Sequence, residues 1–387
     1  MNQVSEFMTQ LLKSEIAEEE LCCEKKIALT DKFLIDLLVL SRKHQVAHIV
    51  ASALSNNGYL EKSPQKGEFL NEIYMAVYAQ EKMNEVFEEI SSAFQLNEIP
   101  YIPLKGLVIR GLYPQPWMRT SCDIDILVKE KDINRAEKVI MSLGSYKKTG
   151  ESKHDVIFKS ENGIVLELHY KLLGNKKSPL YVKELSKVWE MAEPDPVNKF
   201  RFNLSDDIFY YYHIMHMAKH FRIGGCGIRP FIDLWLIEKT NRDFSGAKRM
   251  LEKGNIDIFA DNAVKLSRVW FSNEKHSGTT AKMQDFIIEA GSFGSHKTRL
   301  IANSQRSGGK LKFIFSRVFV PYSYLKRDYP ILEKCPILTP WCEICRLFSF
   351  LFGKKKIFKD KYIENLNKEA NAPTDSMENL FYDLGLK

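Results

Sequence analysis

Two carboxylates stand one residue apart in an apolar segment near the middle of the first half of the chain. Asp123 and Asp125 flank Ile124 and precede the apolar run 126–128, a pattern typical of a buried strand. Successive strand side chains point to opposite faces, so both carboxylates emerge on the same face. Unpaired acids beside a sheet's core are costly, and a hard divalent cation is the usual reason to keep them. The pair therefore predicts a metal-dependent phosphoryl or nucleotidyl transferase; surface acids on an edge strand are the alternative.

A third acid follows in the strand predicted at 164–170. Glu167 again alternates with apolar neighbours, and a solvated hairpin face is its alternative interpretation. Two acids from one strand and one from the next can bind Mg²⁺ or Mn²⁺ and leave room for phosphates. We therefore predict Asp123, Asp125 and Glu167 as catalytic metal ligands, with Glu167 also a candidate general base. His169 lies on the same face as Glu167, either as a supporting residue of the site or as a structural histidine.

A predicted phosphate-binding turn lies upstream of the acids. Lys105-Gly106 closes an extended segment and opens a short helix, whose backbone N–H groups and dipole favour phosphate. Gly106 permits close approach of a ligand. Arg119 and Ser121 lead into the acidic strand and could donate to a β- or γ-phosphate. These four residues, together with Lys219 and His220 of a later helix, form the predicted nucleotide-binding set.

Three histidines mark a helix predicted at 206–221. His213, His216 and His220 are three and four residues apart and so share one helix face. We expect this face to line the substrate cleft, with Lys219 and His220 near phosphate. Ordinary packing is the alternative. The predicted supporting residues of the site, besides His169, are His216 and Asp233.

Seven cysteines are spaced irregularly, which favours a reducing cytoplasm over a disulfide framework. A zinc site that joins Cys226 to the histidines is a weaker alternative, because a flexible glycine-rich loop surrounds it. Cys342 and Cys345 are expected to be buried thiols of a packed helix rather than metal ligands. The N-terminus has no basic segment followed by an apolar core, and no apolar run approaches 18 residues, so the sequence predicts no transmembrane segment.

These landmarks resemble the polymerase β-like nucleotidyltransferase superfamily and, more closely, the bacterial family of uncharacterised nucleotidyltransferases. The resemblance rests on the segments 104–106, 123–128, 167–169, 216–220, 233–234, 329–330 and 338–340, and Tyr113 and Arg119 between them. It implies transfer of a nucleoside monophosphate, AMP from ATP in the favoured case, onto an acceptor hydroxyl with release of pyrophosphate. The superfamily's Gly-Ser or Gly-Gly turn is Lys105-Gly106 here, so Ser121 or Lys105 would replace the missing serine.

The elements that must position these residues form three regions. Helical patterns fill residues 1–95, a small α/β core with a mixed sheet spans 96–195, and helical patterns return over 196–387. This predicts an α+β fold, a nucleotidyltransferase-type sheet core with helical flanks. At 387 residues, with 44% hydrophobic and 27% charged residues, the chain has the size and composition of a globular protein with a sizeable core.

The acceptor is not encoded in a motif, because one fold serves many substrates. The segment 297–361 holds 15 Lys or Arg against 4 Asp or Glu. It could bind nucleic acid or an anionic membrane surface, or be a solvated basic face. No nucleic-acid module accompanies it, so a small molecule, peptide or protein acceptor is favoured. A nucleotide-binding or scaffold protein that keeps the fold without turnover is the alternative function.

Overall fold

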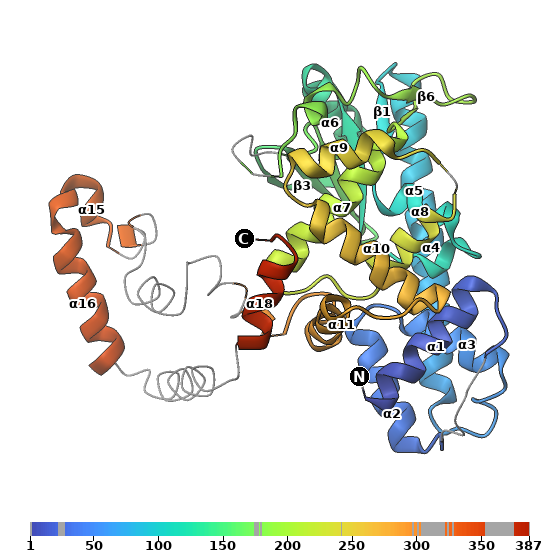
Figure 1. The fold of residues 1–387 in the computed structure, drawn as a ribbon. Coiled ribbons are helices and arrows are strands. Elements are labelled where there is room, and N and C mark those ends of the chain that lie inside the picture. Colours follow the sequence, from blue (N-terminus) through green and yellow to red (C-terminus); the bar gives the residue numbers. More distant parts are fainter. Residues whose placement is uncertain are drawn as a thin grey trace.

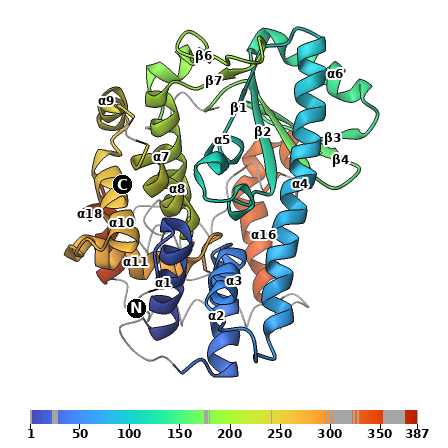
Figure 2. The same cartoon turned by 90° about the vertical axis from the view of Figure 1, so that its right-hand side faces the viewer.

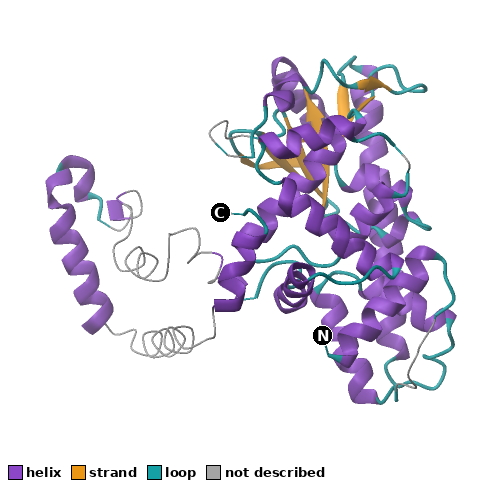
Figure 3. Ribbon diagram, in the orientation of Figure 1, coloured by secondary structure: helices purple, strands orange, loops and turns teal. Residues whose placement is uncertain are grey.

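The computed structural model has an α+β architecture, in which helices flank a five-stranded sheet (Figure 1). Colouring by secondary structure shows the strands gathered at one end of the molecule and helices elsewhere (Figure 3). The predicted fold class is thereby confirmed. The structure describes residues 2–21, 28–173, 178, 180–240, 242–295, 298–299, 302, 322, 325–326, 329–352 and 375–386.

The helices before the sheet begin and end where the sequence provides local signals. Thr30 caps its helix because its side-chain oxygen accepts a hydrogen bond from the backbone N–H of Phe33 at 3.2 Å. The longest helix contains no proline, and its one glycine, Gly67, lies in the first turn. These elements are α1 (Gln3–Ala17), α2 (Asp31–Lys43), α3 (Ala47–Asn56) and α4 (Lys66–Leu96).

The sheet has the strand order β1-β2-β5-β4-β3, in which β2 and β5 are parallel and the other neighbours antiparallel. The strands β4 and β5 form a hairpin, with Gly163 at φ +83° in its turn. The strand β3 was not predicted, because Lys147 and Lys148 make it a polar edge strand. The bounds are β1 (Tyr101–Pro103), β2 (Asp123–Val128), β3 (Tyr146–Glu151), β4 (Asp155–Ser160) and β5 (Val165–His169).

The two faces of the sheet differ in chemistry. One face packs against α4 and α6 (Ile133–Ser142), which run along the sheet in Figure 2. Because alternate side chains of a strand point to opposite faces, the acidic residues of β2 and β5 lie on the other face. The apolar residues of these two strands on the packed face are Ile124, Ile126, Val128, Leu166 and Leu168.

The helices after the sheet share an apolar cluster with α1–α3. Phe221, Phe286 and Phe381 meet in this cluster although they lie far apart in the sequence. The region boundaries near residues 95 and 195 stay a prediction. The elements are β6 (Glu193–Pro194), β7 (Phe202–Asn203), α7 (Asp206–Arg222), α8 (Arg229–Glu238), α9 (Ser245–Lys253), α10 (Asp257–Ser272), α11 (Gly278–Ala290) and α18 (Asp375–Asp383).

The elements α15 (Ile331–Lys334), η5 (Pro336–Leu338) and α16 (Thr339–Phe352) stand apart from the rest in Figure 1. Their small apolar cluster includes buried Cys342, whose thiol is free. Much of the predicted basic segment 297–361 lies outside the described residues. Within the part of the chain that the structure describes, no helix combines the length and the apolar character needed to cross a membrane.

Candidate active site

The parallel pairing of β2 with β5 brings two of the predicted acids side by side. Asp125 is the register partner of Glu167, and Asp123 lies two residues earlier on the same face of β2. The Asp125 side chain is 3% exposed, whereas that of Glu167 is 26% exposed. The site is therefore buried at Asp125 and more accessible at Glu167.

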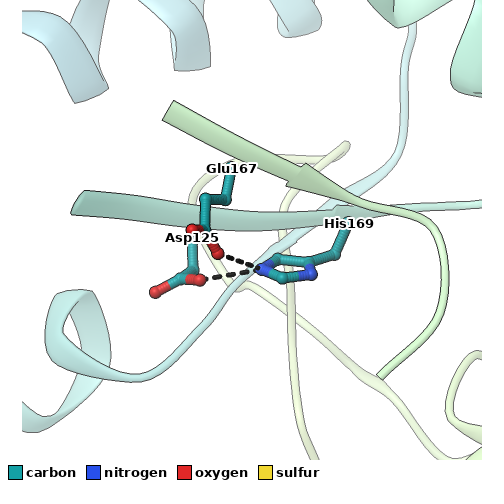
Figure 4. Close-up of side chains that lie close together, drawn as sticks. All are labelled: Asp125, Glu167 and His169. Atoms are coloured by element: carbon teal, nitrogen blue, oxygen red, sulfur yellow. Dashed lines mark hydrogen bonds and ion pairs between the residues drawn. The ribbon is translucent and has the colours of Figure 1, made fainter. Parts of the chain in front are cut away.

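Asp125 is held by two nitrogen donors on a single oxygen. Lys105 Nζ donates to Asp125 Oδ1 at 2.6 Å, and His169 Nε2 donates to the same oxygen at 2.8 Å. Glu167 Oε2 lies 3.3 Å from the same nitrogen of His169, which stands between the two carboxylates in Figure 4. Burial alone would raise the pKa of Asp125, but the charge of Lys105 and the contacts with His169 hold it below its ordinary value.

The surroundings also shift the pKa values of His169 and Asp123. Burial by itself would lower the pKa of His169, but its hydrogen bonds to Asp125 and Glu167 raise this pKa to about 8. Burial and the negative charge of Asp125 raise the pKa of Asp123 to about 6. A carboxylate kept beside other carboxylates in this way gains from a cation placed among them.

The donor set fits a divalent cation. Asp125, Glu167 and His169 each offer one ligand atom, and these atoms lie within 4.8 Å of one another. Asp123 adds a further carboxylate on the same face of the sheet. Carboxylate oxygens suit Mg²⁺ and Mn²⁺, and the imidazole nitrogen is better suited to Mn²⁺ than to Mg²⁺.

The turn at Lys105 has an unusual backbone. Lys105 has φ +48° and ψ −120°, a conformation that glycine adopts more readily and that costs a side-chain-bearing residue on the order of 1–3 kcal/mol. The turn is pinned to the acidic strand because Leu104 N–H donates to the backbone oxygen of Asp125 at 3.0 Å. The short helix α5 (Gly106–Ile109) follows, and η1 (Arg110–Leu112) continues it.

The predicted nucleotide-binding residues of the turn and the loop meet in space. A Cβ atom added to Gly106 would lie 3.2 Å from Ser121 Oγ and 3.7 Å from Arg119 Nη1. Gly106 therefore permits the close packing of this loop against α5. Lys105, Gly106, Arg119 and Ser121 form one contiguous group beside the acids.

Two further arginines surround the same loop and were missed from the sequence. Arg119 Nη1 and Arg229 Nη1 both donate to the backbone oxygen of Thr120, at 2.7 and 2.9 Å. Arg110 Nη2 lies 3.4 Å from Ser121 Oγ. Burial and the charge of Arg119 lower the pKa of both Arg110 and Arg229 to about 10, so the three cations repel one another. Such a cluster favours an anion.

Asp233 is the carboxylate that partly balances this cluster. It is fully buried on α8, and its Oδ1 accepts from Arg119 Nε and from the hydroxyl of Tyr113, each at 2.7 Å. Asp233 thus supports Arg119 from outside the sheet core. The sequence predicts that Arg119 donates to a phosphate group. In the structure, the Arg119 side chain donates to Asp233 and to the backbone oxygen of Thr120.

Helix α7 faces the acids with a row of polar rings. Tyr212, His216 and His220 are spaced by four residues, and the last two meet with their Nε2 atoms 3.2 Å apart. Burial raises the pKa of Tyr212 to about 12, and the charges of Lys105 and Asp125 act on it through space. Burial likewise lowers the pKa of His220 to about 4, with Lys219 and Lys105 adding to the effect. Tyr212 was missed although it continues the four-residue spacing.

The zinc alternative gains no support from these contacts. His213 Nε2 interacts with the backbone oxygen of Pro230 at 3.1 Å, and Cys226 with that of Gly227.

A further acid, Asp155 on β4, is the register partner of His169 and was also missed. Asp155 Oδ2 lies 3.0 Å from His154 Nε2 and 3.9 Å from His169 Nδ1, the latter too long for a hydrogen bond.

Comparison with known proteins agrees with this geometry. Curated proteins give no match to the chain. The model of a family described as uncharacterised nucleotidyltransferases matches residues 35–272, which include the sheet, the acids, α7 and α8. This match covers more than half of the 387 residues and confirms the resemblance predicted from the landmarks. The chain belongs to this family of uncharacterised nucleotidyltransferases.

Proposed function

We propose that this protein transfers AMP from ATP to the hydroxyl group of an acceptor and releases pyrophosphate. The observation that carries the proposal is the juxtaposition of Asp125 with Glu167 and His169, beside the arginine cluster of Arg110, Arg119 and Arg229. Acids that fit a divalent cation next to cations that fit a polyphosphate suit nucleotidyl transfer. The free thiols of the described cysteines are consistent with a cytoplasmic reaction.

Asp123, Asp125 and Glu167 are the residues that would hold Mg²⁺ or Mn²⁺. When bound, the ion neutralises phosphate charge and orients the triphosphate. The arginines and the backbone N–H of Gly106 bind the β- and γ-phosphates. Lys219 extends this cationic surface from α7, and His220 beside it is a neutral hydrogen-bonding group.

The proposed chemical step is a nucleophilic displacement at the α-phosphorus. The acceptor oxygen forms a new bond to this phosphorus, and the bond between it and the oxygen bridging to the β-phosphate breaks. Pyrophosphate leaves with the electron pair. The hydroxyl proton passes to a carboxylate oxygen of Glu167, the more exposed of the two acids that contact His169.

The test uses ATP labelled at the α- or the γ-phosphate, incubated with Mg²⁺, the full chain and a cell extract. Transfer of the α-label, but not of the γ-label, to an acceptor is expected. Asp125→Asn should lower this transfer by about a thousandfold, because a removed metal ligand weakens transition-state stabilisation. Asp206→Asn, which alters an exposed acid on α7, is the matched control. Transfer that survives in Asp125→Asn would refute the mechanism.

A second function, nucleotide binding without turnover, is favoured by one observation. Lys105 already supplies a cation to Asp125 at 2.6 Å. Under this alternative, calorimetry would detect ATP binding while no acceptor gains the α-label and no pyrophosphate appears.

A further inference from the structure

The carboxylate of Asp125 uses one oxygen for two donors. Lys105 Nζ and His169 Nε2 both lie within 2.8 Å of Asp125 Oδ1, and the side chain is 3% exposed. Each carboxylate oxygen has two lone pairs, so these contacts fill the capacity of Oδ1. A divalent ion that used this oxygen would have to displace Lys105 or the buried His169.

Lys105 is fixed in this position by its backbone. The ammonium extends from a turn at φ +48°, and the next helix begins at Gly106. Leu104 N–H donates to the backbone oxygen of Asp125, which ties the turn to the strand that carries the acid. The Lys105 side chain is 23% exposed. The ammonium is therefore a built-in part of the acidic site rather than a mobile surface charge.

Electrostatics limits how many further cations the acids accept. A divalent ion about 5 Å from an ammonium is repelled by about ten times the thermal energy, even at an effective dielectric constant of 20. Lys105 cancels one of the three negative charges that Asp123, Asp125 and Glu167 carry when all are ionised, and His169 cancels a further one in its protonated form. One divalent ion therefore already meets the negative charge left on these side chains, and a second would leave them with an excess of positive charge.

Enzymes that catalyse in-line displacement at phosphorus often hold two divalent ions. We propose that the Lys105 ammonium takes the place of one of these ions, so that this site binds a single ion. Asp123, Glu167 and the second oxygen of Asp125 remain for this ion. The inference rests on the proposed function. It assigns to Lys105 the neutralisation of Asp125 that a second ion would otherwise provide.

The experiment counts Mn²⁺ ions, with no need for an acceptor. The full chain is dialysed to equilibrium against Mn²⁺ and saturating α,β-methylene-ATP, and the excess of Mn²⁺ and of nucleotide on the protein side of the membrane is measured by atomic emission and by absorbance. We expect one bound ion per wild-type chain and two per chain in Lys105→Met. Lys105→Gly, whose new residue suits the backbone of the turn, should also bind two and provides a second variant if Lys105→Met folds poorly. Lys171→Met, which removes a lysine that pairs with Glu130 at 2.7 Å, is the control and should bind one.

The outcomes separate this inference from the function on which it rests. Two ions bound by the wild-type chain would overturn the role of Lys105 and leave the proposed transferase intact. One ion or none in both Lys105 variants, with one in the wild type, would also overturn it. Absence of any bound Mn²⁺ in the wild type would remove the metal-dependent function itself, and the inference with it.

Discussion

The substitution Asp233→Ala tests how α8 supports the loop that leads into the acidic strand. Asp233 is fully buried, and one of its oxygens accepts hydrogen bonds from Arg119 and Tyr113 at 2.7 Å each. Its removal leaves the guanidinium of Arg119, 9% exposed, without its carboxylate partner. Breaking one side of a buried ion pair costs about 3–5 kcal/mol. We expect the free energy of unfolding to fall by this amount at pH 7.

The pH dependence of this loss has a definite sign. Burial alone would raise the pKa of Asp233, but the charge of Arg119 and the hydrogen bonds keep it below the ordinary value. A carboxyl group whose pKa is lowered by folding stabilises the protein above its unfolded-state pKa of about 3.9. This contribution is lost as the pH falls through the lower folded-state value. The difference between wild type and Asp233→Ala should therefore be full at pH 7 and shrink below about pH 4.

Urea denaturation followed by circular dichroism measures the effect. Asp206→Ala is the matched control, because Asp206 pairs with Arg242 at 2.9 Å while both side chains are more than 40% exposed. An exposed pair contributes less than about 1 kcal/mol. The double variant Arg119→Met/Asp233→Leu should recover much of the loss, since it removes both charges of this buried pair. Equal losses for Asp233→Ala and Asp206→Ala would refute the reasoning.

Three further predictions address nucleotide, metal and acid. Arg229→Met should weaken ATP binding about tenfold in calorimetry, the expected loss for one charge-assisted contact, with an unchanged circular dichroism spectrum. Removal of metal with EDTA should abolish transfer of the α-label, and added Mg²⁺ or Mn²⁺ should restore it. Burial lowers the pKa of His48 to about 4, so this residue alone should lower the free energy of unfolding by about 2 kcal/mol between pH 6.5 and 4.5. The fall that urea denaturation measures between the two pH values should therefore be about 2 kcal/mol smaller in His48→Gln than in wild type.

Local patterns in the sequence were sufficient to predict the acidic strands. The alternation around Asp123, Asp125 and Glu167 indicates which face these residues occupy, because the strand period is two whatever the rest of the fold does. The fold class followed from the same alternation and from the helical periods on either side. The polar edge strand β3 was missed because its pairing, not its hydrophobic pattern, defines it.

The rest of the candidate site depends on contacts between distant segments. Arg229 is 109 residues from Thr120 in the sequence, and Asp233 is 114 residues from Arg119. Nothing near either residue indicates such a partner. The pairing of Lys105 with Asp125 is likewise a consequence of the antiparallel pairing of β1 with β2, which sequence periodicity does not specify.

The nucleotide end of the candidate site is a joint property of the sheet core and the helices that follow it. Arg229 lies in the first turn of α8 and Asp233 one turn later, so one helix carries both a cation of the arginine cluster and the carboxylate that holds Arg119. A shift of α8 would therefore move two opposite charges at once relative to Thr120. Charge-assisted contacts weaken steeply with distance. Under the proposed function, the affinity for phosphate should therefore depend on the position of α8. The fragment 96–195 alone would keep the acids proposed to bind metal. It would lose Arg229 and Asp233, one cation of the arginine cluster and the carboxylate that partly balances this cluster.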